Sequence, residues 1–479
     1  MISFARRIPV FYLYFFSIVI CLCLAVSCKK IDDNNNVTFR FSYPYISFDT
    51  VFTSIGSITR QFTVYNPSKS DVKTTIYLAG GNNSSYSINV NGNPGTYFKD
   101  VAIRGKDSIF VFVKVNINPK NQNNPFLVTD SIVFMTGSRV QALKLYACGQ
   151  DANYIIADQG PENLRYKVVA GEHQTVTWTK ERPYVVYGWA VVDSTGTLII
   201  EPGTKVYFHS NSGLWAYKFS NLEVNGTYSE PVLFRGDRLE SWFNEDYAQW
   251  SRIWINEGAD VTINNAIITN AFVGVQIEPL PTNDGPIYVT DNIIKIENTI
   301  ITNTKNSGVI SRFLNLDMTN CLITNNGGCG LQLEGGQFTM KHLTVANYYM
   351  QADRSAPACY VTNKVALYND LPMDVKANFI NCIIYGRNET EIEVEKDQGA
   401  NAELTLQNCL LRSKNNATYF IECLHNEDPQ FTDRSKLDFT LLPESPAIGK
   451  GKPNIEVPFD ILGNSRGDFP DIGAYQFGK

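Results

Sequence analysis

Hydrophobic and polar residues alternate along most of the chain, and one short phrase of this kind returns six times between residues 261 and 423. Each copy opens with a polar residue, usually asparagine, and continues with mostly apolar residues. The copies open at Asn265, Asn298, Asn320, His342, Asn381 and Asn408, at intervals of 22 to 39 residues. Short alternating segments without a helical period predict β-strands. A repeat of drifting length predicts a solenoid in which some coils carry inserted loops, here at residues 279–293 and 351–375.

The opening asparagines predict a particular corner of this solenoid. Asparagine tolerates left-handed backbone conformations and bonds its own backbone at turns. We therefore expect these side chains to stack in a hydrogen-bonded ladder along one corner. His342 replaces an asparagine in this ladder and is expected to have a structural role. The asparagines of the ladder are Asn265, Asn298, Asn320, Asn381 and Asn408. A second asparagine follows five positions later in four copies, at Asn270, Asn303, Asn325 and Asn347. A β-sandwich with accidental internal similarity is the alternative fold.

The repeat resembles that of the right-handed parallel β-helices of the pectate-lyase-like superfamily. The resemblance extends from near Thr197 to the C-terminus, and residues 198–204 and 222–227 look like opening coils. Residues 445–449 and 471–475 resemble the closing, choice-of-anchor-like motif of exported bacterial β-helices, which implies a capping role for Asp460, Arg466 and Asp471. The superfamily contains polysaccharide lyases, glycoside hydrolases, epimerases and members without known catalysis. The resemblance therefore implies a fold and leaves the activity open.

Residues 38–150 show a different pattern, in which alternating strands return at short spacing between Gly, Pro and Asn residues. Residues 57–65 alternate clearly and end in the turn 66–68. This spacing predicts a seven-stranded immunoglobulin-like β-sandwich. It resembles bacterial domains allied to the choice-of-anchor and major-sperm-protein-like sandwiches, which bind or act as spacers. We expect a connector over residues 151–186 and the β-helix with its cap over residues 187–479.

The N-terminus has the pattern of a targeting segment. Arg6 and Arg7 precede an apolar run over residues 8–26, and a small residue precedes Cys28. This phrase resembles the lipobox of lipoproteins of the Bacteroidota type. It implies a signal peptide over residues 1–27, a lipid on Cys28 and a polar tether over residues 28–37. We expect an outer-membrane location by lipid anchor, with exposure at the cell surface. The apolar run is also long enough to remain as an uncleaved membrane anchor.

The cysteines indicate buried thiols. Cys321, Cys382 and Cys409 share one register of the repeat, directly after the ladder position. Alternation along the strand turns this position inward, where a free thiol behaves as a small hydrophobic group. Cys321 and Cys382 are separated by a coil carrying Leu343, so we do not expect them to pair. The spacing of the cysteines matches no metal site.

Charged residues share another register, 13 or 14 positions after the ladder residue. They are Glu278, Arg312, Glu334, Glu395 and Glu422, and Glu391 and Glu393 alternate with Glu395. Coils stand about 4.8 Å apart, so Glu395 and Glu422 are expected to face each other. The superfamily resemblance implies that such carboxylates hold Ca²⁺ or act as acid and base. The alternative is a solvated strand face on which Arg312 offsets its neighbours.

An aromatic and acidic segment over residues 238–250 interrupts the repeat and is expected to form a loop. Its ring-bearing residues could stack on sugars or could hold the loop against the solenoid; they are Trp242, Phe243, Tyr247 and Trp250. No Ser/His/Asp arrangement, HExxH motif or phosphate loop is present in the sequence.

The composition is that of a folded chain, with 44% hydrophobic and 18% charged residues, and the net charge of −6 gives no basic surface for nucleic acid. We expect a binding or structural protein with a glycan or protein partner and no cofactor other than Ca²⁺. A polysaccharide lyase or glycoside hydrolase is the alternative.

Overall fold

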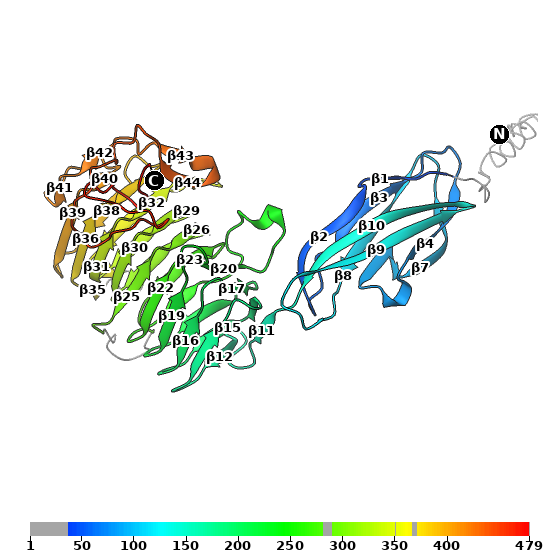
Figure 1. The fold of residues 1–479 in the computed structure, drawn as a ribbon, viewed down its shortest axis with the longest axis horizontal. Helices are drawn as coiled ribbons and strands as arrows, with labels where there is room; N and C mark the ends of the chain where they lie inside the picture. Colours follow the sequence, from blue (N-terminus) through cyan, green and yellow to red (C-terminus); the bar gives the residue numbers. More distant parts are fainter. Residues whose placement is uncertain (1–36, 281–289, 350, 366–370, 479) are drawn as a thin grey trace, which may run out of the picture. The chain divides into compact units, whose positions relative to one another are not determined.

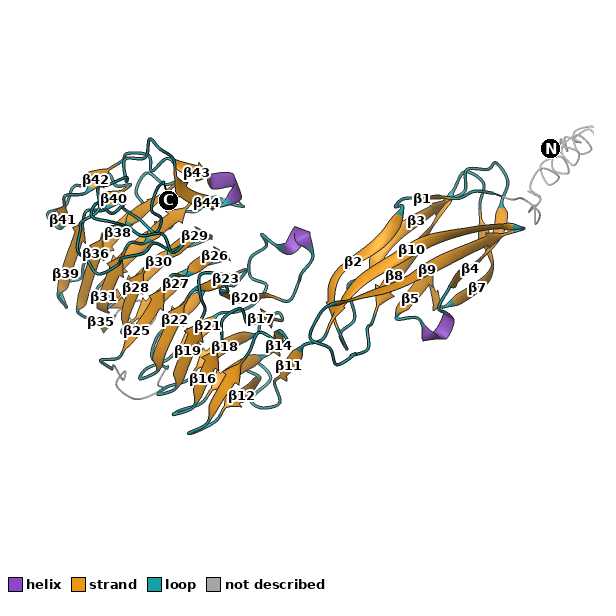
Figure 2. Ribbon diagram, in the orientation of Figure 1, coloured by secondary structure: helices purple, strands orange, loops and turns teal. Residues whose placement is uncertain are grey.

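The computed structural model describes residues 37–280, 290–349, 351–365 and 371–478. These residues form two compact units, and the boundary along the chain falls between Asp151 and Ala152 (Figure 1). The expected signal peptide, Cys28 and almost all of the tether lie outside the described residues. The described part is nearly all β, with short 3₁₀ turns at Gly81–Asn83 (η1), Ser241–Phe243 (η2) and Arg434–Lys436 (η4) (Figure 2). None of its helices is long and apolar enough to cross a membrane.

The N-terminal unit is a β-sandwich of two five-stranded sheets. One sheet has the order β1 (Arg40–Phe41), β3 (Arg60–Tyr65), β8 (Ser108–Val115), β5 (Tyr86–Val90) and β6 (Asn93–Gly95). The other has the order β2 (Tyr45–Phe52), β10 (Arg139–Gln150), β9 (Phe126–Thr136), β4 (Val72–Leu78) and β7 (Tyr97–Ile103). Alternate residues such as Phe62, Val64 and Phe134 point inward and form the core. The ten strands exceed the seven that we predicted, because short strands such as β1 and β6 have too few residues to show alternation.

The second unit is a parallel β-helix built from three sheets that run along the solenoid. The eleven-stranded sheet contains β11 (Asn153–Ile156), β14 (Tyr184–Tyr187), β17 (Lys205–Phe208), β20 (Val232–Gly236), β23 (Ala266–Thr269), β26 (Ile300–Thr304), β29 (Leu322–Asn326), β32 (Thr344–Asn347), β37 (Ile383–Gly386), β40 (Leu410–Leu411) and β42 (Leu424–His425). The nine-stranded sheet contains β12 (Tyr166–Ala170), β15 (Trp189–Val192), β18 (Gly213–Ala216), β21 (Ile253–Ile255), β24 (Val275–Ile277), β27 (Val309–Arg312), β30 (Leu331–Glu334), β33 (Cys359–Thr362) and β38 (Ile392–Glu395).

The ten-stranded sheet contains β13 (Thr175–Trp178), β16 (Thr197–Ile200), β19 (Asn221–Asn225), β22 (Asp260–Asn264), β25 (Ile293–Glu297), β28 (Asn315–Thr319), β31 (Gly336–Lys341), β36 (Val375–Ile380), β39 (Ala402–Gln407) and β41 (Phe420–Ile421). Two short antiparallel pairs complete the fold. They are β34 (Lys364–Val365) with β35 (Leu371–Pro372), and β43 (Phe431–Asp433) with β44 (Asp438–Leu441). The inward side chains of the three sheets form one continuous apolar core.

The solenoid begins earlier than the sequence indicated. The segment 151–186, expected to be a connector, supplies one strand to each of the three sheets: β11, β12 and β13 pair in parallel with β14, β15 and β16. This prediction was wrong because the first coil lacks the opening asparagine, so its short strands carry no repeat signal.

The corner between the ten-stranded and eleven-stranded sheets has a left-handed backbone at every opening residue of the repeat. The φ angles there are 50° at Asn265, 53° at Asn320, 52° at His342 and 50° at Asn408. The Asn320 amide nitrogen donates to Asn298 Oδ1 at 3.2 Å, whereas Asn298 itself donates to Asn264 Oδ1 at 2.9 Å. The corner is therefore a partial ladder: some asparagine amides donate a hydrogen bond to the ladder residue of the adjacent coil, and others donate to a residue outside the ladder.

The C-terminal segment after His425 packs along the side of the solenoid. Apolar outward residues of the eleven-stranded sheet, including Leu322 and Ile383, share a buried cluster with Phe439, Ile472 and Tyr475. Asp460, Arg466 and Asp471, expected in a cap, are buried within this segment. Arg466 Nη2 donates to Asn320 Oδ1 at 2.8 Å and to Gly473 O at 3.0 Å, which joins the segment to the asparagine corner.

Candidate functional site

The outer face of the nine-stranded sheet carries two columns of side chains, because strand residues alternate between core and surface. The strand pairing places Val191, Trp215, Trp254, Gln276, Ile310, Gln332, Tyr360 and Glu393 in the first column. The second column begins with Asp193, Tyr217, Asn256 and Glu278 and continues with Arg312, Glu334, Thr362 and Glu395. The composition of this face changes along the solenoid from aromatic to polar and then to acidic.

The N-terminal end of the face is aromatic. The rings of Trp215 and Trp254 stack with centroids 4.6 Å apart, and the Trp189 ring lies 5.9 Å from Trp254. Trp215 Nε1 donates to Asn256 Oδ1 at 2.5 Å. Trp254 Nε1 is buried and has no hydrogen-bond partner among the described residues. A buried indole N–H normally finds an acceptor, so this donor marks the cluster as unusual for a purely structural contact.

A groove of about 340 Å³ lies over these first coils. It is lined by Gln159, Leu164, Tyr166, Val168, Val191, Asp193, Trp215 and Tyr217. The Tyr217 ring stands edge-on to Trp215, with centroids 5.5 Å apart. We refer to this site as the aromatic groove. It combines apolar ring surface with a carboxylate and an amide side chain, which is the usual composition of a small-molecule or saccharide pocket.

The aromatic groove was not predicted from the sequence. Gln159, Leu164 and Tyr166 belong to the coil that was interpreted as a connector. The available signal was the alternation of large aromatic and small residues in β15 and β18, which places a tryptophan on the outer face of each strand.

The middle of the face is a charge-balanced network of buried polar groups. Arg312 Nη1 lies 2.8 Å from Glu278 Oε2, and Arg312 Nε lies 2.9 Å from Glu334 Oε2. Both glutamates are only 4% exposed. Burial alone would lower the pKa of Arg312, but Glu334 and Glu278 outweigh it and raise the pKa. The arginine therefore stays charged between two carboxylates that have little capacity left for a cation.

Glutamine side chains extend this network in both directions. Gln276 Nε2 donates to Glu278 Oε1 at 2.5 Å, and Gln276 also accepts from Arg252. Gln332 donates to Glu334 and accepts from Ser307 Oγ at 3.1 Å. No group of three His, Cys, Asp or Glu side chains suited to a metal occurs in the described part of the chain.

The C-terminal end of the face is acidic and exposed. Tyr360 Oη donates to Glu395 Oε2 at 2.5 Å, and burial together with Glu395 raises the pKa of Tyr360. Glu393 and Glu395 point outward, but Glu391 does not belong to this face. It is buried and paired with Arg354 Nη2 at 2.5 Å, and burial raises its pKa although Arg354 acts in the opposite sense. The prediction of three aligned carboxylates was wrong because Glu391 precedes β38, where the chain still turns through the corner.

Glu422 also lies elsewhere. It follows β41 and has a φ angle of 52°, so it occupies the asparagine corner one coil after Asn408. The last turn passes from β40 to β41 without a strand in the nine-stranded sheet. Counting 14 residues from Asn408 therefore reaches the next corner, and the expected contact between Glu395 and Glu422 was wrong. Thr362, which the repeat did not reveal, stands between Glu334 and Glu395.

The loop over residues 238–250 does not form a continuous aromatic platform. Trp250 is 1% exposed, stacks on Phe208 with centroids 4.3 Å apart and donates from Nε1 to Thr269 O, so it belongs to the core. The Phe243 ring is covered by the Arg238 guanidinium at 4.0 Å. The Tyr247 ring lies 5.9 Å from that of Tyr349. Trp242 remains 49% exposed.

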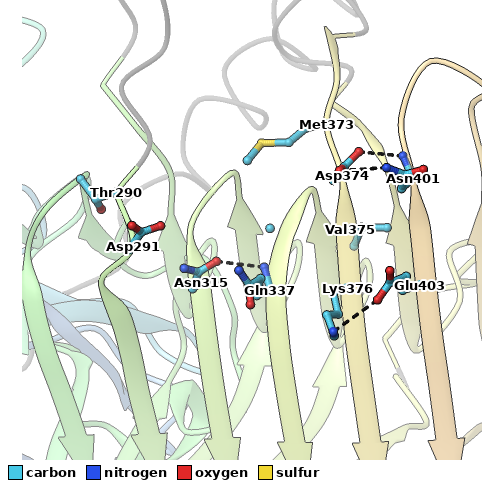
Figure 3. A pocket seen from close by; sticks show the side chains of 11 residues that line it. Thr290, Asp291, Asn315, Gln337, Met373, Asp374, Val375, Lys376, Asn401 and Glu403 are labelled. Carbon is cyan, nitrogen blue, oxygen red and sulfur yellow. Dashed lines mark hydrogen bonds and ion pairs between the residues drawn. The ribbon is translucent and has the colours of Figure 1, made fainter.

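A second cavity, of about 380 Å³, lies at the edge of the ten-stranded sheet (Figure 3). Asp374 accepts hydrogen bonds from Asn401 N at 2.7 Å and Asn401 Nδ2 at 3.1 Å, which lower the pKa of Asp374. Lys376 Nζ pairs with Glu403 at 3.3 Å. Figure 3 shows these contacts across neighbouring strands. Among the described residues that line this cavity there is no aromatic side chain, in contrast to the aromatic groove.

Residues 187–348 match the family described as "Right handed beta helix region". The matched segment contains most of the asparagine corner and the network around Arg312. The chain has no significant match among curated protein sequences.

Proposed function

We propose that this protein is a glycan-binding protein of the cell envelope and that the aromatic groove is its binding site. The observation that carries the proposal is the groove itself, in which the rings of Tyr166, Trp215 and Tyr217 share one concave surface with Asp193 and Gln159. A sugar ring has one apolar face and a rim of hydroxyl groups. Aromatic rings suit the face, while carboxylate and amide groups suit the rim.

The arrangement of the strands supports an extended ligand. The sheet that carries the aromatic groove continues into the network around Arg312 and then to Glu393 and Glu395. Coils are about 4.8 Å apart, so an oligosaccharide lying along the axis would pass one coil after another. Trp254, whose buried Nε1 has no partner among the described residues, stacks on Trp215 of the groove.

Binding without turnover is favoured over the lyase or hydrolase alternative. Glycosidases need one carboxyl group that holds a proton and a second that is ionised. Glu278 and Glu334 both hold Arg312, which keeps them as ion-pair partners. The carboxyl whose pKa is raised, Glu391, is buried against Arg354 and lies away from the groove.

The test is a titration of the purified chain, from residue 29 onward, with a panel of acidic and neutral oligosaccharides. All six tryptophans lie between residues 178 and 254, so a ligand in the groove should change the tryptophan fluorescence. Tyr217→Ala removes one ring wall and should weaken binding by about 1 kcal/mol, or roughly fivefold.

Tyr228→Ala is the matched control, since Tyr228 is equally aromatic, lies outside the groove and is highly exposed. The ligand would have to bind elsewhere if both variants lost the same affinity, or if Tyr217→Ala left the affinity unchanged. Release of shorter products during the titration would favour the catalytic alternative.

The envelope location in this proposal depends on Cys28, which we propose bears the lipid that anchors the protein in the outer membrane. Cys28→Ala should leave the leader uncut and abolish incorporation of labelled fatty acid. Continued labelling of that variant would contradict the lipid anchor while leaving the glycan site open to test.

A further inference from the structure

The last coils of the solenoid bring three thiols into one column. Leu410 pairs with Ile383 on one side and with Leu424 on the other, so the residues that precede them, Cys382, Cys409 and Cys423, occupy equivalent positions in successive coils. Cys382 N donates to Cys409 Sγ at 3.4 Å. The Cys409 side chain is also the largest influence on the pKa of Cys423, so the two thiols are close neighbours. We infer that Cys409 and Cys423 form a disulfide that ties the final coil to the one before it.

The geometry of neighbouring coils permits this bond. Adjacent strands of a sheet lie about 4.8 Å apart, and disulfides bridge Cα atoms separated by roughly 4.4–6.8 Å. Leu424 N donates to Cys409 O at 2.8 Å, which holds the two cysteines side by side. Cys409 and Cys423 directly precede the paired residues Leu410 and Leu424, so bond formation requires rotation of the side chains and little movement of the backbone.

Accessibility selects Cys423 as the thiol that reacts first. Cys382 and Cys409 are completely buried, whereas Cys423 is partly exposed at the end of the solenoid. The neighbouring Cys409 side chain lowers the pKa of Cys423, and burial raises the pKa of Cys409. The thiolate is the attacking form, so the partly exposed Cys423 is also the better nucleophile.

The oxidant is a small-molecule disulfide. The Cys423 thiolate attacks one of its sulfur atoms, forms a mixed disulfide and releases the first small thiolate. Cys409 then attacks the Cys423 sulfur and expels the second small thiolate, and the two protons from the cysteines complete the two released thiols. One small disulfide is reduced to two thiols, and the cysteine pair loses two electrons and two protons.

Tryptic digestion allows the disulfide partner of each cysteine to be identified by mass spectrometry. Cleavage after lysine and arginine places Cys382, Cys409 and Cys423 in separate peptides, residues 377–387, 397–412 and 415–434. The full chain, purified in detergent, is incubated with oxidised glutathione, quenched in acid, alkylated and digested. We expect peptide 397–412 linked to peptide 415–434, together with the loss of the free thiols of Cys409 and Cys423 and slower hydrogen exchange at the Leu424 amide.

Two variants serve as controls. Cys423→Ser should abolish the link and leave Cys409 as a free thiol, whereas Cys321→Ser, which changes a buried thiol three coils away, should leave the link intact. Cys148, a partly buried thiol in the sandwich, should form only a glutathione adduct. A link between peptides 377–387 and 397–412, a glutathione adduct that persists on Cys423, or no reaction at Cys423 would overturn the inference.

Discussion

His342 should make the solenoid less stable in mild acid, because its surroundings accept only the neutral ring. The side chain is fully buried at the asparagine corner. Its Nδ1 lies 3.2 Å from Gly473 O, and its Nε2 lies 3.1 Å from Asn381 Nδ2. A carbonyl needs a donor and an amide nitrogen needs an acceptor, so Nδ1 carries the proton and Nε2 receives the hydrogen bond.

Burial, followed by the charge of Arg466, lowers the pKa of His342 well below its usual value. In the unfolded chain the pKa is about 6.5. Above that pH both states are neutral and the full stability is present. As the pH falls below it, the unfolded chain binds a proton that the folded protein rejects, so stability is lost. From pH 7.5 to pH 5.5 the expected loss from this residue is about 1.4 kcal/mol.

The measurement is urea unfolding of the purified chain, followed by tryptophan fluorescence at several pH values. The six tryptophans all lie in the solenoid, so the signal excludes the sandwich. His342→Asn is the comparison variant, since asparagine occupies the equivalent corners and tolerates the φ angle of 52°. Other titrating groups are common to both proteins and cancel in the difference.

Between pH 7.5 and pH 5.5 the free energy of unfolding of the wild type should therefore fall by about 1.4 kcal/mol more than that of His342→Asn. Parallel curves between pH 7.5 and pH 5.5 would show that His342 does not keep a depressed pKa, and the hydrogen-bond assignment at this corner would then be wrong.

Three further substitutions test the corner and the outer face, each by the urea midpoint and slope. Arg312→Ala leaves Glu278 and Glu334 buried without their cation and should cost about 3–5 kcal/mol; a cost below 1 kcal/mol would mean that the network is open to water. Asn320→Leu removes the acceptor of Arg466 and the amide that donates to Phe459 O, and should cost about 1–3 kcal/mol; an unchanged midpoint would contradict a structural role for this corner. Glu422→Asn relieves a left-handed glutamate and should stabilise the protein by roughly 0.5–1 kcal/mol; a lower urea midpoint would contradict backbone strain at this position.

The sequence alone was sufficient to predict the architecture, because the signals were local and repeated. Strand alternation, the opening asparagine and turn residues recur in each coil of the middle region, and each is a property of a few adjacent residues. These signals predicted the solenoid and the sandwich, and they placed Arg312 and Glu334 in a shared register that the strand pairing also shows.

The tertiary structure decided everything that depends on which coil lies beside which. Glu422 and Glu395 are similarly spaced from their asparagines, yet the missing strand in the last turn sends Glu422 to the corner. In the sequence Trp250 cannot be distinguished from the exposed Trp242 of the same loop, yet its ring fills the core beside Phe208. The aromatic groove needs the first coil, which has no repeat signal, and the C-terminal segment finds its apolar partners in earlier coils of the eleven-stranded sheet, such as Leu322. Pairing between distant segments is set by the packing of the whole coil stack, which no local pattern encodes.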